Sequence, residues 1–233
     1  MDDFDLDKLA GYLHLDPAQV ARLVERGKLP GRRVAGDWRF SRSEIHHWLE
    51  ERIGLSEEGE LQRVEGAMQA AGSHPHDELS LAAMLPTEAI QVPLAARTRN
   101  SVIDSMLDVA SRTGWLWDPE KMADAVRSRE EMHPTALDNG VALLHPRRPM
   151  GNILEQAFLA FGRTDAGIPF GSSRGALTDL FFLICSTDDR GHLHTLARLS
   201  RLLNSSDFLA ELRSAPDAAS IRELFERAEA ELR

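Results

Sequence analysis

Seven positively charged side chains fall between positions 22 and 42 of this 233-residue chain, and they are the first group in it whose types and spacing suggest a chemistry. Only Glu25 and Asp37 oppose them there, so the local charge is +5 (seven minus two), whereas the whole chain carries −10. The overall charge disfavours nucleic acid as a partner of the whole chain, but a local basic stripe is typical of a surface that binds phosphate groups. The seven cations are Arg22, Arg26, Lys28, Arg32, Arg33, Arg39 and Arg42.

The histidines and the single cysteine give no reason to expect a metal site. His192 and His194 lie two residues apart, so on a helix their rings point in different directions and cannot share one ion. No other histidine has an evident partner, although His74 and His76 in a polar segment could bind metal adventitiously. Cys185 closes an apolar run, which predicts a buried, inert thiol, and a single cysteine excludes a disulfide within the chain.

The composition is that of a globular protein. The chain is 42% hydrophobic and 27% charged, so it can bury a core and is not predicted to be disordered. Its longest apolar run, Leu180–Cys185, is far shorter than the ~20 residues that span a bilayer, and its acidic start is unlike a secretory signal. We therefore expect a soluble, cytoplasmic protein with one large domain or two small ones.

Residues 1–53 have the pattern of a small, mainly helical domain that contains a hairpin. The spacing of apolar residues predicts a helix over residues 6–13, and Asp16-Pro17 provides the cap and first-turn proline of a second helix. Two short strand-like pieces flank Ala35-Gly36-Asp37, which predicts a turn. Ser41 and Glu44 then form a capping box at the start of a last helix.

A polar segment over residues 54–78 is predicted to link this domain to the rest of the chain. It contains few large apolar residues between Gly54 and Asp77, so it is either a flexible spacer or a weak dimer helix along Leu61, Val64 and Met68.

Residues 79–233 alternate between helical patterns and apolar runs, which is typical of an α/β domain. Buried strands are predicted over residues 140–144, 157–161 and 180–185. A helix is predicted around residues 102–110, and another from Asp118-Pro119 to about Arg129. The tail from Asp189 is predicted to be helical, with breaks near Asn204 and Pro216.

The first 53 residues carry a series of short motifs. They are Leu9-Ala10, Val20-Ala21-Arg22-Leu23-Val24, Gly27-Lys28-Leu29-Pro30, Gly36-Asp37-Trp38-Arg39-Phe40, Glu44-Ile45 and Trp48-Leu49. In this order they resemble the excisionase type of winged helix-turn-helix domain, a relative of the MerR fold. The resemblance implies that this domain binds double-stranded DNA through a recognition helix and a wing.

The residues that would contact DNA divide into two groups. Gln19, Arg22 and Arg26 would donate hydrogen bonds from the exposed side of the recognition helix, away from its apolar stripe. Trp38 is predicted to pack within the wing rather than against a base. The basic residues that would lie on the wing and the helix after it and contact phosphates are Arg32, Arg33, Arg39 and Arg42. Lys28 is a further DNA-binding candidate.

The second part of the chain carries three further motifs in a fixed order. They are Arg129-Glu130 with Thr135 and Asn139–His145, then Gly162-Arg163 with Ile168–Gly171, then His192-Leu193 with Leu196–Leu199. They resemble the enzyme IIA domain of the fructose/mannitol (PtsN-like) type in the bacterial phosphotransferase system. The resemblance implies an α/β fold with a mixed sheet flanked by helices.

The resemblance also implies a chemistry, in which His145 takes a phosphoryl group from the histidine of an HPr-like phosphocarrier without a metal, a nucleotide or any other cofactor. The end of a strand would aim His145, and the turn after it would leave the ring accessible. His192, near the start of a helix, would donate to the phosphoryl oxygens, and Thr135 would supply a hydroxyl donor. Arg129 would bond either the phosphate or the loop that holds it.

The residues around His145 depart from the usual form of this family. Leu144 and Pro146 stand where proline and glycine are usual, and Arg147 and Arg148 follow. Proline after His145 removes a backbone amide that could face the phosphate. The two arginines add positive charge, which either replaces that amide or binds a different anion.

We interpret the chain as a bacterial regulator that joins a DNA-binding domain to a phosphoacceptor domain and works as a homodimer, with phosphate on His145 changing DNA binding or assembly. One alternative is a phosphocarrier that passes phosphate to a sugar-permease IIB domain and whose N-terminal module does not bind DNA. Another is a non-phosphorylated relative that senses an anion near Arg129, Arg147 and His145. The basic wing favours the regulator over the carrier, and Leu144 and Pro146 keep the anion sensor open.

Overall fold

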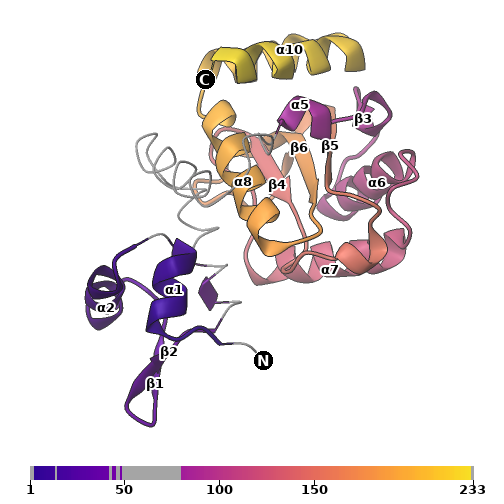
Figure 1. Ribbon diagram of the computed structural model, residues 1–233. Helices are drawn as coiled ribbons and strands as arrows, with labels where there is room; N and C mark the ends of the chain where they lie inside the picture. The colour runs from indigo at the N-terminus through magenta and orange to yellow at the C-terminus, as the bar shows by residue number, and fades with distance from the viewer. Residues whose placement is uncertain (1–2, 14, 42–43, 46–47, 49–79, 232–233) are drawn as a thin grey trace. The chain divides into compact units, whose positions relative to one another are not determined.

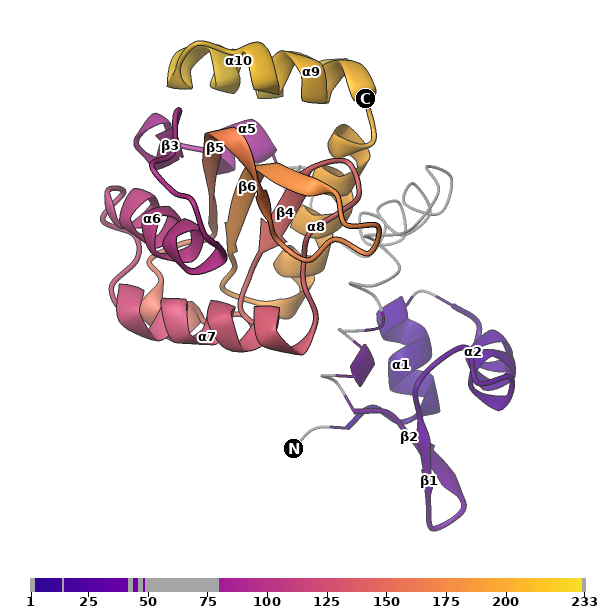
Figure 2. The ribbon, with the colours of Figure 1, turned by 180° about the vertical axis from the view of Figure 1, so that it is seen from behind.

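The structure is a computed structural model that describes residues 3–13, 15–41, 44–45, 48 and 80–231. The chain divides into two compact units between Glu78 and Leu79, and each is considered by itself. The linker predicted over residues 54–78, with its apolar seam of Leu61, Val64 and Met68, lies outside the described residues, and so does Arg42. Figure 1 and Figure 2 show the two units from opposite sides.

The first unit begins with two helices, α1 (Leu6–Leu13) and α2 (Pro17–Glu25), as the sequence predicts. The side chain of Asp16 caps α2 by accepting from the amide of Ala18 at 2.8 Å. In return, the side chain of Gln19 accepts from the amide of Asp16 at 3.1 Å. Pro17 occupies the first turn, where no amide donor is needed, and Gly27 follows the helix with a φ of +65°.

A two-stranded antiparallel hairpin, β1 (Arg32–Val34) and β2 (Asp37–Arg39), forms the wing. Its turn is one residue shorter than the predicted Ala35-Gly36-Asp37, because Asp37 pairs with Val34 in the ladder. Ala35 and Gly36 have φ angles of 54° and 96°. Two successive positive φ angles are typical of a type I′ turn, whose twist matches that of the two strands.

The start of the last predicted helix and the small core complete the first unit. The amides of Glu44 and Ile45 donate to the carbonyl of Ser41 at 3.1 and 3.0 Å, so a helical turn begins where the capping box predicts it. Trp48 donates its indole N–H to the carbonyl of Lys28 at 2.7 Å, which ties this segment to the turn after α2. The fully buried core residues are Leu9, Val20, Phe40 and Ile45.

The second unit is an α/β domain, as predicted, and within residues 80–231 its sheet is mixed, with strand order β3-β5-β6-β4. β3 is parallel to β5, β5 is antiparallel to β6, and β6 is parallel to β4. The elements are α5 (Leu81–Met84), η1 (Thr87–Ala89), β3 (Ile90–Gln91), α6 (Arg99–Ser111), α7 (Pro119–Met132), β4 (Val141–Leu144), η2 (Gly151–Ile153), β5 (Phe158–Pro169), β6 (Leu177–Cys185), α8 (Asp189–Leu203), α9 (Ser206–Ser214) and α10 (Ala218–Glu231).

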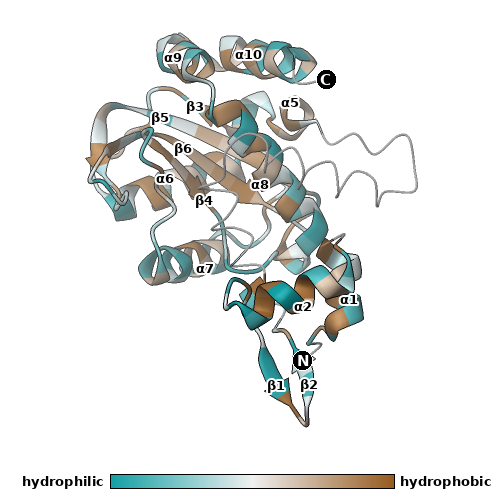
Figure 3. Cartoon of the chain, turned by 90° about the vertical axis from the view of Figure 1, so that its left-hand side faces the viewer, coloured by the Kyte–Doolittle hydropathy of each residue, from teal (hydrophilic) through white to brown (hydrophobic). Residues whose placement is uncertain are grey.

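Both faces of this sheet are apolar, and its strands are mostly brown in Figure 3. One face packs on α6 and α7 in a single buried cluster. On the other face, the ring of Phe182 lies 4.9 Å from that of Phe161 and 6.1 Å from that of Phe225 on α10. Since helices cover both faces, the strands are hydrophobic runs rather than alternating patterns. The strand residues in the cluster with α6 and α7 are Ala142, Leu144, Phe158, Ala160, Ile168, Phe181, Leu183 and Cys185.

Strand β5 is longer than the strand predicted over residues 157–161. It continues to Pro169 and pairs with β6 as a hairpin, through an irregularity in register between Arg163 and Ile168. The apolar run ends at Phe161, so the sequence gives no hydrophobic signal for the second half of the strand. Gly162 directly follows Phe161, and a Cβ atom at this residue would lie 2.7 Å from the sulfur of Met106, which is too close for a side chain.

The helices and the buried thiol of the second unit follow the predictions. α7 is capped by Asp118 and extends three residues beyond the predicted end at Arg129. The tail forms α8, α9 and α10, with breaks near Asn204 and Pro216. Cys185 is fully buried, and desolvation raises the pKa of its thiol, which confirms an inert cysteine.

A buried ion pair joins helices α5, α8 and α10. Arg198 of α8 and Glu229 of α10 are each 6% exposed, and the Nε of Arg198 donates to Glu229 at 2.9 Å. The same carboxylate accepts from the amides of Leu81 and Ala82 at 2.7 and 3.1 Å, and from the hydroxyl of Ser80 at 2.9 Å. This group of bonds, the Glu229 clasp, fixes the first turn of α5 to the helix that carries His192.

Candidate functional site

The candidate site is built around His145, which directly follows strand β4. Its Nδ1 lies 2.7 Å from the carbonyl oxygen of Leu143. A carbonyl oxygen can only accept a hydrogen bond, so Nδ1 carries a proton, and in the neutral ring Nε2 carries the lone pair. The strand end therefore fixes both the direction of the ring and its tautomer.

His192 is brought to His145 by the pairing of their two strands. β4 and β6 are parallel, with Leu144 opposite Leu183, so His145 and the turn that starts α8 lie at the same edge of the sheet. The two imidazole rings have centroids 5.1 Å apart with 52° between their planes. The Nδ1 of His192 lies 3.1 Å from the hydroxyl of Ser186, which fixes the second ring. The predicted pairing of the two histidines is thus present.

The site is more enclosed than the sequence predicts. His145 is 3% exposed and His192 is 2% exposed, whereas the turn after His145 was expected to leave the ring accessible. Two features account for the difference: the ring of His192 packs against that of His145, and Pro146 is itself buried. The next two residues in the chain, Arg147 and Arg148, are exposed.

Arg129 contacts the loop before β4, which is one of the two partners that the sequence predicts for it. Its guanidinium is buried (5% exposed), and its Nη1 donates to the carbonyl of His133 at 2.6 Å. Since His133 follows the last turn of α7, Arg129 holds the loop that leads into β4.

Thr135 was expected to supply a hydroxyl to the phosphate, but its hydroxyl donates to the carboxylate of Glu130. Its amide also donates to Glu130, at 3.2 Å, and both residues are buried. Arg99 closes this network by donating to the Glu130 carboxylate at 2.7 Å and to its carbonyl at 2.8 Å. The Thr135 hydroxyl thus fixes the loop before β4, because the buried Glu130 carboxylate needs hydrogen-bond donors.

Glu130 and Arg99 are residues that the sequence analysis did not assign to the site. The signal for Glu130 was its position beside Arg129 in the motif, but its partner Arg99 lies 31 residues away at the start of α6. Nothing in the sequence connects the two.

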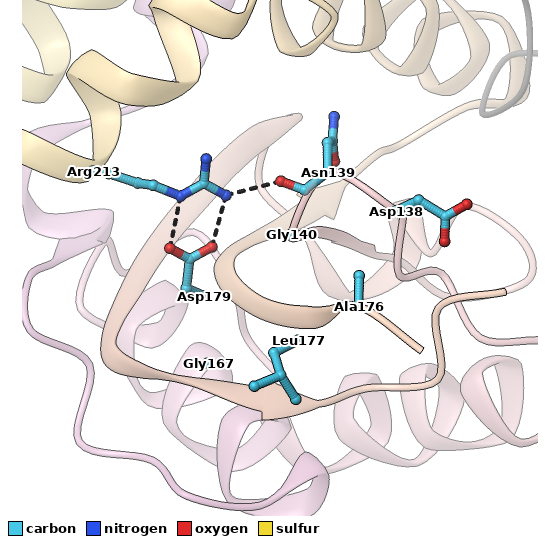
Figure 4. A pocket seen from close by; sticks show the side chains of 8 residues that line it. All are labelled: Asp138, Asn139, Gly140, Gly167, Ala176, Leu177, Asp179 and Arg213. Atoms are coloured by element: carbon cyan, nitrogen blue, oxygen red, sulfur yellow. Dashed lines mark hydrogen bonds and ion pairs between the residues drawn. The ribbon is translucent and has the colours of Figure 1, made fainter. Parts of the chain in front are cut away.

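A cavity of about 430 Å³ lies at the other end of β4, lined partly by Gly140, Asn139 and Arg213 (Figure 4). Gly140 and His145 are five positions apart, so at ~3.3 Å per strand residue the cavity wall at Gly140 is ~16 Å from His145. Arg213 makes a two-pronged ion pair with Asp179 at 2.7 and 2.8 Å and donates to the carbonyl of Asn139 at 2.8 Å. Its charge is already matched, so this cavity is not assigned as an anion site.

Most of the predicted DNA-contacting cations of the first unit are exposed. Gln19 is also exposed, but the oxygen of its side chain is used in the cap of α2, so only its amide N–H groups remain for a contact. The half-buried Trp38 stacks 6.3 Å from Phe40 and under Arg33 at 4.9 Å, which confirms its predicted packing role. The exposed cations are Arg22, Arg26, Lys28, Arg32 and Arg33, and Arg39 is half-buried.

Two further findings concern the described part of the chain. It contains no cluster of three or more histidine, cysteine or carboxylate side chains arranged to hold a metal ion. None of its helices is both long and apolar enough to cross a bilayer.

The fold and the histidine pair define an α/β domain of the enzyme IIA type, joined to a helix-turn-helix unit. Residues 83–228 match the family described as phosphoenolpyruvate-dependent sugar phosphotransferase system, EIIA 2, and the chain belongs to this family. Residues 4–53 match a helix-turn-helix domain family. Both resemblances inferred from the sequence are therefore confirmed.

Several proteins are similar to the second unit. The fructose-specific EIIABC component of Bacillus subtilis is 28% identical over 145 residues, which cover 61% of this chain and only 22% of that protein. The fructose-specific EIIA component of Haloferax volcanii is 25% identical over 64% of this chain and 96% of its own length. The crystal structure of nitrogen regulatory protein IIA-Ntr from Neisseria meningitidis has a TM-score of 0.54 at 22% identity, covering 62% of this chain and 97% of that one.

Proposed function

We propose that this chain is a regulator in which an enzyme IIA-type domain accepts a phosphoryl group on His145 from an HPr-like phosphocarrier and a helix-turn-helix domain binds double-stranded DNA. The observation that carries the proposal is the pairing of His145 with His192, 5.1 Å apart, in a chain that also has an exposed basic helix-turn-helix unit. The family membership of both parts supports it. The direct test is incubation with phosphoenolpyruvate, enzyme I and HPr, followed by mass measurement.

The lone pair on the Nε2 of His145 is the proposed nucleophile. It forms a nitrogen–phosphorus bond on one side of the phosphorus atom while the donor's nitrogen–phosphorus bond breaks on the other, and the electron pair of that bond returns to the donor's ring. The Leu143 carbonyl holds the proton on Nδ1, so Nε2 is ready to react. Because His145 is only 3% exposed, the segment after β4 has to move away from the ring before the donor's phosphoryl group can reach Nε2.

His192 is proposed to stabilise the transferred group. When the hydroxyl of Ser186 donates to the Nδ1 of His192, the Nε2 of that ring carries a proton and can donate to a phosphoryl oxygen. Arg129 and Thr135 are proposed to keep the loop before β4 in place, through their bonds to His133 and Glu130. Pro146 has no backbone N–H group to donate to the phosphoryl group. The exposed Arg147 and Arg148 are proposed to compensate by supplying positive charge to it.

The burial of His145 also favours a second candidate, a relative that binds a small anion near Arg129, Arg147 and His145 without being phosphorylated. The two candidates differ in whether His145 forms a covalent bond to phosphorus. The carrier alternative, with transfer onward to a IIB domain, differs from both in having no role for DNA.

Replacing Arg22 with alanine is expected to weaken DNA binding by about 1–3 kcal/mol if the side chain contacts a base edge. Arg22 is exposed on α2, the proposed recognition helix. Fluorescence anisotropy with a labelled duplex measures the affinity, and its log–log salt slope should be about −0.9 per phosphate contact. Arg174→Ala, an exposed arginine of the second unit, is the matched control. Binding that is absent, or that does not depend on salt, would reject the DNA-binding role.

We expect the chain to be a homodimer, and we expect phosphorylation to weaken its binding to DNA. A small helix-turn-helix unit makes few contacts, so a homodimer that contacts two half-sites is proposed. Phosphate on His145 adds about −1.5 to −2 charges to a chain that already carries −10. Sedimentation and DNA titration with and without phosphorylation test both points, with His145→Gln treated in the same way as the control. A monomer with one DNA affinity in both states would contradict the coupling.

A further inference from the structure

The acidic start of the chain lies against the wing of the first unit. Asp3 contacts Arg32 of β1, with 2.7 Å between the carboxylate oxygen and the guanidinium nitrogen. The Asp3 side chain is 24% exposed and that of Arg32 is 64% exposed, so the pair sits at the surface where a partner can reach it. Arg32 is one of the cations proposed to contact a DNA phosphate.

Backbone and ring contacts hold this acidic segment in place, so the ion pair does not depend on the two side chains alone. The residue after Asp3, Phe4, is buried and exchanges two backbone hydrogen bonds with Phe40 at 2.9 and 3.0 Å. Its ring stacks on Tyr12 of α1 at 4.9 Å. Residues 3–5, the acidic arm, therefore lie along the segment that follows β2.

Asp5 is the second carboxylate of the acidic arm, and the charge of the wing residue Arg39 acts on it. Asp5 accepts from the amide of Lys8 at 2.8 Å, and this bond, with the charges of Lys8 and Arg39, lowers the pKa of Asp5. Asp5 is therefore ionised at neutral pH and adds to the negative charge beside the wing.

We propose that the acidic arm is an internal competitor of DNA, in which the Asp3 carboxylate occupies the guanidinium of Arg32 and withholds it from a phosphate. This inference rests on the DNA-binding role proposed above. A carboxylate and a phosphate oxygen accept the same charge-assisted bonds from a guanidinium, so the Asp3 carboxylate competes for the N–H groups of Arg32 and offsets the charge that attracts a phosphate. An exposed ion pair is weak, so the arm lowers the affinity for DNA without abolishing binding.

The test measures DNA binding by the full, unphosphorylated chain with a labelled duplex of mixed sequence over a range of salt concentrations. Asp3→Asn is expected to raise the affinity about two- to five-fold at low salt, which is the range for loss of an exposed ion pair. It should also make the log–log salt slope steeper by about 0.9, because Arg32 gains one phosphate contact.

Two further variants separate this effect from a general change of charge. Asp7→Asn removes the same charge from an exposed position on α1, for which the described residues show no ion pair, and should leave the slope unchanged. In an Arg32→Gln background, Asp3→Asn should no longer steepen the slope. Equal slopes for the Asp3 and Asp7 variants, or a gain that persists without Arg32, would overturn the proposal. Failure of every variant to bind DNA would reject the DNA-binding role itself, and the competitor with it.

Discussion

His145→Gln is expected to abolish incorporation of acid-labile phosphate when the chain is incubated with phosphoenolpyruvate, enzyme I and HPr. Glutamine keeps a polar side chain of similar reach but has no ring nitrogen with a lone pair to attack phosphorus. His192→Ala is expected to accept phosphate slowly, because it removes a donor to the phosphoryl oxygens and leaves the nucleophile in place. Intact mass measured over time gives both the yield and the rate.

His133→Gln provides a matched control, since its side chain is exposed and its two bonds to Arg129 are made by its backbone carbonyl and amide. It should accept phosphate as the unmodified chain does. Incorporation that survives His145→Gln would move the site to another residue. A folded chain that takes up no phosphate, but binds a phosphate or sulfate ion in a manner lost with Arg147→Ala, would favour the anion-sensing relative.

The parts of the fold that depend on local sequence could be predicted closely. Asp16-Pro17 and Asp118-Pro119 cap their helices as expected, because a cap needs only residues that are neighbours in the chain. The pairing of His145 with His192 could also be predicted, although they are 47 positions apart in the chain, because the motif order matches a known family.

What the sequence could not predict depends on contacts between distant residues. The hydroxyl of Thr135 was assigned to the phosphate, but the buried carboxylate of Glu130 takes it, together with Arg99. Arg163, part of a motif, donates from one nitrogen to the carbonyls of Leu212, Arg213 and Ala215 at the end of α9. Since helix carbonyls at a carboxyl end need donors, an arginine from a distant strand can supply them, but nothing in the local pattern indicates which.

The burial of His145 and the position of the acidic arm are further examples. Whether a turn exposes the residue before it depends on what packs over the turn, and here His192 lies against the ring. Similarly, the composition shows that the start of the chain is acidic, but not that Asp3 reaches Arg32, 29 residues away.

Glu229→Ala is expected to destabilise the second unit by about 3–5 kcal/mol. Its carboxylate is buried and accepts from Arg198 and from three donors around the first turn of α5. Removing it takes the Glu229 carboxylate away from the buried Arg198 guanidinium and leaves the amides of Leu81 and Ala82 without this acceptor. Glu229→Gln should cost less, because its side-chain oxygen can still accept from these amides.

Differential scanning calorimetry of the full chain measures this loss as a lower Tm for the transition of the second unit, by about 2–4 °C per kcal/mol for a unit of this size. Glu231→Ala, which removes an exposed carboxylate from the same end of α10, is the matched control and should shift that transition little. If Glu229→Ala and Glu231→Ala melt together, the clasp contributes nothing measurable to stability. If only Glu229→Ala melts early, the clasp stabilises the packing of α5 against α8, and with it the helix that holds His192 beside His145.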